Sequence, residues 1–139
     1  MSPKRDPADP REWLRRARSN LARAKLHPRP PDVLLEDLCF DAQQAAEKAV
    51  KAVLVKLQVR FPKTHSLSDL LGRVEGAGIH IPEELLEAAT LTDYAVDARY
   101  PGLSEDVTVD EYETAVLLAE RVVTWAEQFV QATDAGFRS

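Results

Sequence analysis

The residues that could do chemistry are densest between positions 91 and 101 of the chain. This segment holds two tyrosines, two aspartates and an arginine: Asp93, Tyr94, Asp97, Arg99 and Tyr100. An arginine presents a planar fork of N–H donors to a phosphate, and a tyrosine offers a flat face to a nucleotide base. The segment is therefore a candidate ligand site. The alternative is that Arg99 pairs with Asp93, Asp97 or Glu47 and only fixes a helix end.

The other reactive side chains, three histidines and one cysteine, form no recognisable catalytic motif. The histidines are His27, His65 and His80, which fall in separate parts of the chain and share no helical face. The sequence also lacks GxSxG, HExxH and CxxC motifs and a glycine-rich phosphate loop. We therefore expect no metal site and no cofactor. Cys39 is expected to pack in the core as a small apolar residue.

His65 stands directly before Ser66, the predicted N-cap of a short helix. In a structural role its ring would hydrogen-bond a neighbouring turn. In a functional role it would contact a ligand phosphate. Both interpretations remain open at this point.

A stripe of aromatic and polar residues lies outside the apolar face of the longest predicted helix. It consists of Phe40, Gln44, Glu47 and Lys51, at the spacing i, i+4, i+7 and i+11. An exposed aromatic beside an amide and an i, i+4 ion pair is typical of a contact surface. We interpret this stripe as the interface of a symmetric homodimer.

The elements that position these residues are predicted to be five helices, because apolar residues recur at helical spacing and no stretch alternates like a strand. Helices are expected from Asp9 to before Pro28, over about 32–57, from Ser66 to about 76, from Pro82 toward Tyr94, and from Thr108 to about 132. The sequence thus predicts an all-α bundle. Residues 1–8 are expected to be a flexible tail, 9–132 a single domain and 133–139 a C-terminal tail.

The charge is distributed unevenly along the 139 residues. Residues 1–30 carry nine Lys and Arg against three Asp and Glu, and the remainder carries nine against twenty. A basic first helix could meet a phosphate backbone or an acidic partner, or it could simply dock on the acidic remainder. The chain has no apolar run long enough to span a membrane and no secretory signal, so we expect a cytoplasmic protein without membrane contact.

Three short motifs resemble the HEPN family (higher eukaryotes and prokaryotes nucleotide-binding). The run FDAQQAAEKA at 40–49 resembles the signature of the family's second helix. The run FPKTHSL at 61–67 resembles the entry to its third helix, with serine where the family has aspartate. Asp93-Tyr94 and Arg99-Tyr100-Pro101 resemble its "Y…RYP" element. Together the motifs cover about residues 10–132 in the family's order and spacing.

The resemblance implies a five-helix up-and-down bundle that forms homodimers. It also implies a partner, because prokaryotic members often accompany a minimal nucleotidyltransferase in toxin–antitoxin-like operons. Many members are metal-independent ribonucleases with an R-x(4–6)-H motif. Arg99 matches that arginine, but Ser104, Glu105 and Asp106 stand where the histidine should be, and no histidine follows Arg99. An acidic pair cannot replace an imidazolium acid at neutral pH.

The sequence therefore predicts a non-catalytic, dimeric HEPN module that binds a nucleotide, a nucleotidyltransferase, or both. The expected ligand-binding residues are Arg99, Tyr100, Lys48 and His65. One alternative is a ribonuclease toxin that uses Arg99 with a displaced base such as His65. A second alternative is a purely structural helical dimer.

Overall fold

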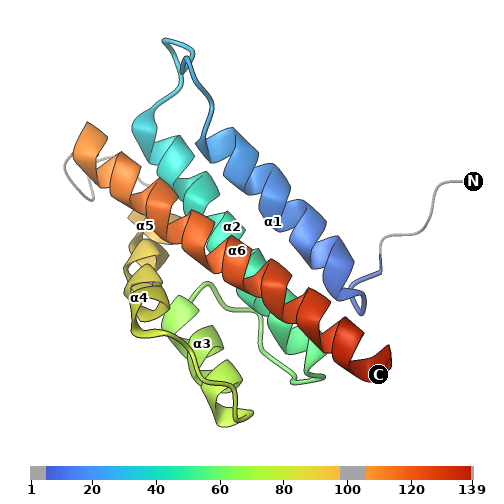
Figure 1. The fold of residues 1–139 in the computed structure, drawn as a ribbon. Coiled ribbons are helices and arrows are strands. Elements are labelled where there is room, and N and C mark those ends of the chain that lie inside the picture. The colour runs from blue at the N-terminus through green and yellow to red at the C-terminus, as the bar shows by residue number, and fades with distance from the viewer. Residues whose placement is uncertain (1–5, 98–105, 139) are drawn as a thin grey trace, which may run out of the picture.

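The computed structural model describes residues 6–97 and 106–138, which are helical wherever they form regular structure (Figure 1). The helices are α1 (Pro10–Ala24), α2 (Leu35–Lys56), α3 (Leu67–Gly76), α4 (Glu83–Leu86), the 3₁₀ helix η1 (Glu87–Asp93), α5 (Tyr94–Asp97) and α6 (Val109–Arg138). The prediction of an all-α bundle is confirmed. No described helix combines the length and the apolar character that crossing a bilayer requires.

Helix α2 is the centre of the molecule. It packs along α1 on one side and α6 on the other, and it also contacts α3, η1 and α5. Its buried face carries small residues at the contacts, namely Ala42, Ala45, Ala46, Ala49 and Ala52, all fully buried. Because alanine projects only a methyl group, neighbouring backbones approach closely, and the three long helices lie side by side in Figure 1.

The helix starts follow the capping residues in the sequence. The Asp9 carboxylate accepts a hydrogen bond from the backbone N–H of Arg11, and the Ser66 hydroxyl accepts one from Asp69. Thr108 and Glu111 form a reciprocal capping box at the start of α6. The predicted starts of α1, α3 and α6 are therefore confirmed, and α2 begins at Leu35 rather than near residue 32.

Two predicted helices differ from the structure. The expected single helix from Pro82 is divided into α4, η1 and α5. The Thr90 hydroxyl donates to the carbonyl of Glu87, and the Thr92 hydroxyl accepts the N–H of Leu67, so this segment is also bonded to the start of α3. Helix α6 runs to Arg138, past the end expected near 132, since no proline interrupts it. Residues 1–5 of the expected N-terminal tail lie outside the described residues.

The basic surface of α1 is paired with acids. Arg18 contacts Glu127 at 3.4 Å and Lys25 contacts Glu120 at 2.8 Å, both on α6. Further along α1, Arg15 and Arg16 both pair with Glu12. Such exposed pairs add little stability, but they balance part of the excess positive charge on α1 with acidic side chains. The first helix docks on the acidic remainder, which is the second of the two interpretations above.

The core prediction is tested by truncating a fully buried residue of α2. We expect Leu54→Ala to lower the free energy of unfolding by about 2–5 kcal/mol, because it removes buried methyl groups and leaves a cavity. Urea denaturation measures the loss. Leu117→Ala is the control, since Leu117 is 47 % exposed and its truncation should cost less than about 0.5 kcal/mol. Equal losses in the two variants would contradict the packing described.

Candidate ligand-binding site on helix α2

A buried carboxylate organises the polar face of α2. Glu47 is 3 % exposed and accepts hydrogen bonds from three side chains. Gln43 Nε2 and Lys51 Nζ, one turn to either side on the same helix, each lie 2.9 Å from it. His65 Nδ1, from the loop between α2 and α3, lies 2.8 Å from Oε1. The i, i+4 spacing of residues 43, 47 and 51 thus places two donors against one buried acid.

These contacts determine the charge of Glu47. Burial by itself raises the pKa of this carboxyl, but the hydrogen bonds from Lys51, Gln43 and His65 outweigh burial and leave the pKa below its ordinary value of 4.5. Glu47 is therefore an anion at neutral pH. Because a carboxylate can only accept, the His65 nitrogen that faces it carries the proton.

The same contact leaves the second nitrogen of His65 available. The His65 side chain is 51 % exposed, with Nδ1 directed at Glu47. Its position is held further by Gln43, whose Nε2 lies 3.4 Å from the His65 carbonyl oxygen. A carboxylate that fixes Nδ1–H leaves Nε2 of the neutral ring as an acceptor or proton-accepting base.

Lys51 lies in an enclosed position between aromatic rings. Its ammonium is 5.8 Å from the ring centre of Trp13 and 5.7 Å from that of Phe61. These two rings meet edge to face, and Trp13 Nε1 donates to the Pro7 carbonyl. Cation–π contacts of this kind stabilise a desolvated ammonium beside its carboxylate partner.

The stripe predicted as a contact surface is partly buried within the chain. Glu47 and Lys51 are buried and pair with each other, and the Lys51 ammonium lies over the rings of Trp13 and Phe61. Phe40 and Gln44 are half-buried, and the Gln44 amide donates to Gln43 at 2.7 Å. Whether this stripe forms a dimer interface stays a prediction.

Lys48 belongs to a second polar network, on the α1 side of α2. Its ammonium donates to the Asn20 side chain at 2.7 Å, and Asn20 in turn donates to Asp41 at 3.1 Å. Burial lowers the pKa of Lys48, and the nearby positive charges of Arg16 and Arg23 lower it further against the opposing effect of Glu47 and Asp41. The half-buried Lys48 ammonium is thus partly desolvated, and an anionic ligand would stabilise its charge.

Of the predicted ligand residues, the structure describes Lys48 and His65, and these two make contacts on different sides of α2. Lys48 and His65 flank the polar face of α2, Lys48 toward α1 and His65 toward α3, with Gln44 one turn before Lys48. Arg99 and Tyr100 lie outside the described residues, as do Ser104 and Glu105. The chain on either side of this gap is anchored near α2, since α5 packs on α2 and the Val107 N–H donates to Glu36 at 2.8 Å.

Sequence reasoning missed Gln43 and Trp13 as members of the site. Gln43 lies one turn before Glu47, and that i, i+4 relation was a usable signal. Trp13 gave none, because its contact with Lys51 joins residues far apart in the chain. Cys39 is buried as expected, and burial raises the pKa of its thiol to about 12, which excludes a thiolate nucleophile at neutral pH.

Comparison with known families agrees with this architecture. The model of the HEPN domain family matches residues 10–129, which is most of the chain and includes α2 and the His65 loop. The chain belongs to the HEPN family. The earlier motif-based identification is confirmed.

Two solved structures are similar to this HEPN protein over nearly their whole length. One is TT1696 from Thermus thermophilus, with 32 % identity and a TM-score of 0.72, over 86 % of this chain and 97 % of the other. The second is ST0689, an archaeal HEPN homologue, with 26 % identity and a TM-score of 0.68, over 88 % of this chain and 98 % of the other. No curated protein matches the sequence.

The buried ion pair is tested by neutralising its acid. We expect Glu47→Gln to lower the free energy of unfolding at pH 7 by about 3–5 kcal/mol, because the Lys51 ammonium would stay buried without a counter-charge. Urea denaturation at pH 7 measures this loss. A loss below about 1 kcal/mol would show that water reaches the pair.

Two controls separate charge from packing. Glu47→Leu combined with Lys51→Met removes both charges together and should cost far less than the single change.

The loss of stability caused by Glu47→Gln should also depend on pH in a defined direction. The folded-state pKa of Glu47 is depressed, so its contribution is present above 4.5 and is lost as pH falls through the lower folded value. The difference in the free energy of unfolding between wild type and Glu47→Gln should therefore become smaller as the pH falls below 4.5.

Proposed function

We propose that this HEPN protein is a non-catalytic module that binds the phosphate of a nucleotide on the polar face of α2. The observation that carries the proposal is the arrangement around Glu47 and Lys48. On one side, the Glu47 carboxylate orients a half-exposed histidine. On the other, Lys48 is half-buried, burial lowers the pKa of its ammonium, and Asn20 holds it in place.

The roles follow from the chemistry of the groups. Lys48 has three donors, and its contact with Asn20 uses only one, so two remain for phosphate oxygens. His65 adds a hydrogen bond through Nε2, as acceptor when neutral and as donor when charged. Arg99 and Tyr100 are proposed to complete the site as phosphate fork and stacking face. The packing of α5 on α2 supports their inclusion, because they follow α5 directly in the chain.

The association state belongs to the same proposal. Phe40 and Gln44 lie half-buried on α2, and we propose that they meet their counterparts in a homodimer. A minimal nucleotidyltransferase protein in a toxin–antitoxin-like pair is the proposed partner, acting in the cytoplasm. If the protein forms the homodimer but binds neither a nucleotide nor a nucleotidyltransferase, it is the purely structural dimer.

Titration of the purified protein with ATP and with GTP tests the nucleotide proposal. We expect Lys48→Met and His65→Ala each to weaken binding about tenfold, since each removes a hydrogen bond or charge contact to phosphate worth about 1.4 kcal/mol. Isothermal calorimetry measures the affinities. Methionine keeps the apolar stem of Lys48, so packing against α1 is retained.

Arg15→Ala is the matched control for charge. Arg15 is exposed on α1, pairs with Glu12 and lies outside the proposed site, so its loss should leave the affinity unchanged. An absence of binding up to about 1 mM would remove the nucleotide proposal and leave the partner proposal.

A second candidate function is metal-independent RNA cleavage, and one specific observation favours it. The Glu47–His65 contact is the geometry in which a carboxylate orients a histidine base, with Nε2 directed away from the acid. His65 could then accept the proton of a ribose 2′-hydroxyl while Arg99 binds the scissile phosphate. The histidine that the family's R-x(4–6)-H motif requires after Arg99 would be replaced by one from a different loop.

Incubation of total RNA with the protein in the absence of metal distinguishes the two functions. Under the ribonuclease alternative, wild-type protein cleaves RNA, and both Arg99→Ala and His65→Ala abolish cleavage. Under the principal proposal, no variant and no wild-type sample cleaves. Gel analysis of product length provides the readout, and cleavage that survives both substitutions would indicate a contaminating nuclease.

A further inference from the structure

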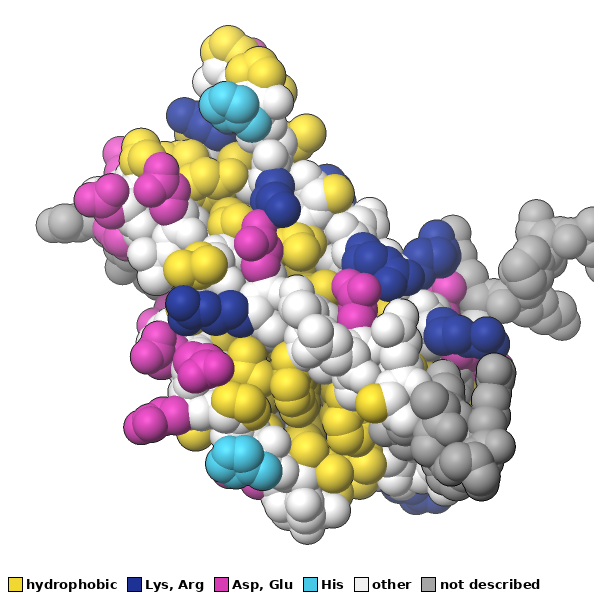
Figure 2. Space-filling model, viewed as in Figure 1, with side chains coloured by type: hydrophobic (Ala, Val, Ile, Leu, Met, Phe, Trp, Pro, Cys, Tyr) yellow, Lys and Arg dark blue, Asp and Glu magenta, His cyan; other side chains and the backbone are white. Residues whose placement is uncertain are grey.

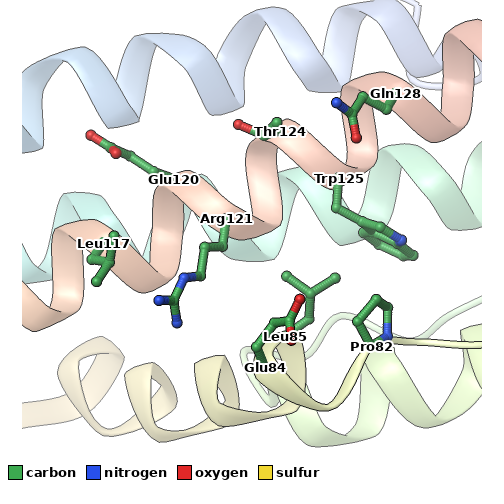
Figure 3. A pocket seen from close by; sticks show the side chains of 9 residues that line it. All are labelled: Pro82, Glu84, Leu85, Leu117, Glu120, Arg121, Thr124, Trp125 and Gln128. Carbon is green, nitrogen blue, oxygen red and sulfur yellow. The ribbon is translucent and has the colours of Figure 1, made fainter.

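A groove lies between α6 and α4, which we call the α4–α6 groove. None of its lining residues belongs to the polar face of α2. It has a volume of about 540 Å³. Four apolar residues line it: Pro82, Leu85, Leu117 and Trp125. In Figure 3 the side chains of Trp125, Leu85 and Pro82 face one another across the gap, and Arg121 extends into it from α6.

The groove is open because α4 is short and because α3 does not pack along α6. Helix α4 is a single turn, and α3 packs against α2 and η1 rather than along α6. Figure 2 shows the result as a strip of hydrophobic side chains between α6 and the α3–α4 segment. Leu117, which lines the groove, is 47 % exposed. A further helix laid in this position would complete the bundle.

The α4 edge of this groove is acidic. Glu84 lines the groove from this side, whereas on α6 Glu120 is paired with Lys25 at 2.8 Å and Arg121 contributes a positive charge. Glu83 and Glu87 stand exposed beside Glu84 on the same edge, where Figure 2 shows acidic side chains next to the hydrophobic strip. An occupant should therefore carry an apolar face bordered by positive charge.

We propose that the α4–α6 groove binds a basic amphipathic helix of another protein. The lined stretch of α6 from Leu117 to Gln128 is about 16 Å long at 1.5 Å per residue, which accommodates about three turns of helix. Apolar anchors at i, i+4 and i+7 would fill the space among Leu117, Leu85 and Trp125. Lysines or arginines flanking these anchors would meet Glu84 and the exposed Glu83 and Glu87 on the α4 edge.

A second copy of this chain does not fit the groove. Among the described helices, only α1 is basic and amphipathic, and its apolar residues Leu14, Ala17 and Ala24 are already buried against the bundle. The α4 edge carries the exposed glutamates Glu83, Glu84 and Glu87, so two copies placed with these edges together would repel each other. The occupant is accordingly a different chain. This inference is independent of the nucleotide site on α2.

Fluorescence anisotropy with a designed peptide tests the proposal. The probe is a fluorescein-labelled helix of about twelve residues, with leucine at i, i+4 and i+7 and lysine at the other positions. We expect it to bind with a dissociation constant in the range of about 10–100 μM, and the same peptide with glutamate for lysine not to bind. Leu117→Asp and Glu84→Lys should each weaken binding about tenfold.

The controls separate a specific groove from general charge attraction. Asp32→Lys changes the net charge by the same amount as Glu84→Lys, at an exposed turn outside the groove, and should leave binding unchanged. Circular dichroism confirms that each variant is folded. Equal weakening by Asp32→Lys and Glu84→Lys would overturn the proposal. So would binding unaffected by Leu117→Asp, no binding up to about 1 mM, or Leu117-dependent self-association without peptide binding.

Discussion

The hydrogen bonds to the buried carboxylate of Glu47 connect three separate parts of the chain. Through Lys51 the carboxylate reaches the aromatic pair of Trp13 and Phe61, and through His65 it reaches the loop that leads into α3. A buried charge without partners is costly, so all three groups must be in place together for the bundle to close. The polar network therefore makes the register of α1, α2 and the α2–α3 loop specific, while apolar burial supplies most of the stability.

The same helix has an architectural role and carries residues of the proposed ligand site. On its inner faces α2 presents alanines, which bring α1 and α6 close, and on its outer face it presents Gln44 and Lys48. Because α2 is rigid and covered by long helices, the polar side chains on it keep their relative positions without support from a ligand. A binding site on such an element is preorganised, and that reduces the entropy lost on binding.

The helices were predictable from local sequence to the extent that their signals are local. Capping residues Asp9, Ser66 and Thr108 each mark a true helix start, since a cap acts within three or four residues. The division of the segment after Pro82 was not predictable, because Thr92 bonds to Leu67, far away in sequence. The candidate site, too, could be predicted only as far as its signals are local in the sequence. Lys48 and His65 could be named from motifs, but the burial of Glu47 and Lys51 depends on Trp13 and Phe61, which only the folded chain brings near.

Because the helices differ in length, we expect different parts of the molecule to exchange their amide hydrogens with solvent at different rates. The middle of α2 is enclosed by α1 and α6, so its amide hydrogens should exchange with solvent only when the whole bundle opens. The α4, η1 and α5 segments are single turns or a 3₁₀ stretch, so we expect their amide hydrogens to exchange sooner than those in the middle of α2. We therefore expect slower amide exchange along α2, which carries the polar face, than along the α4 wall of the α4–α6 groove. Two surfaces of one small domain therefore differ in how far they can adjust to what they bind.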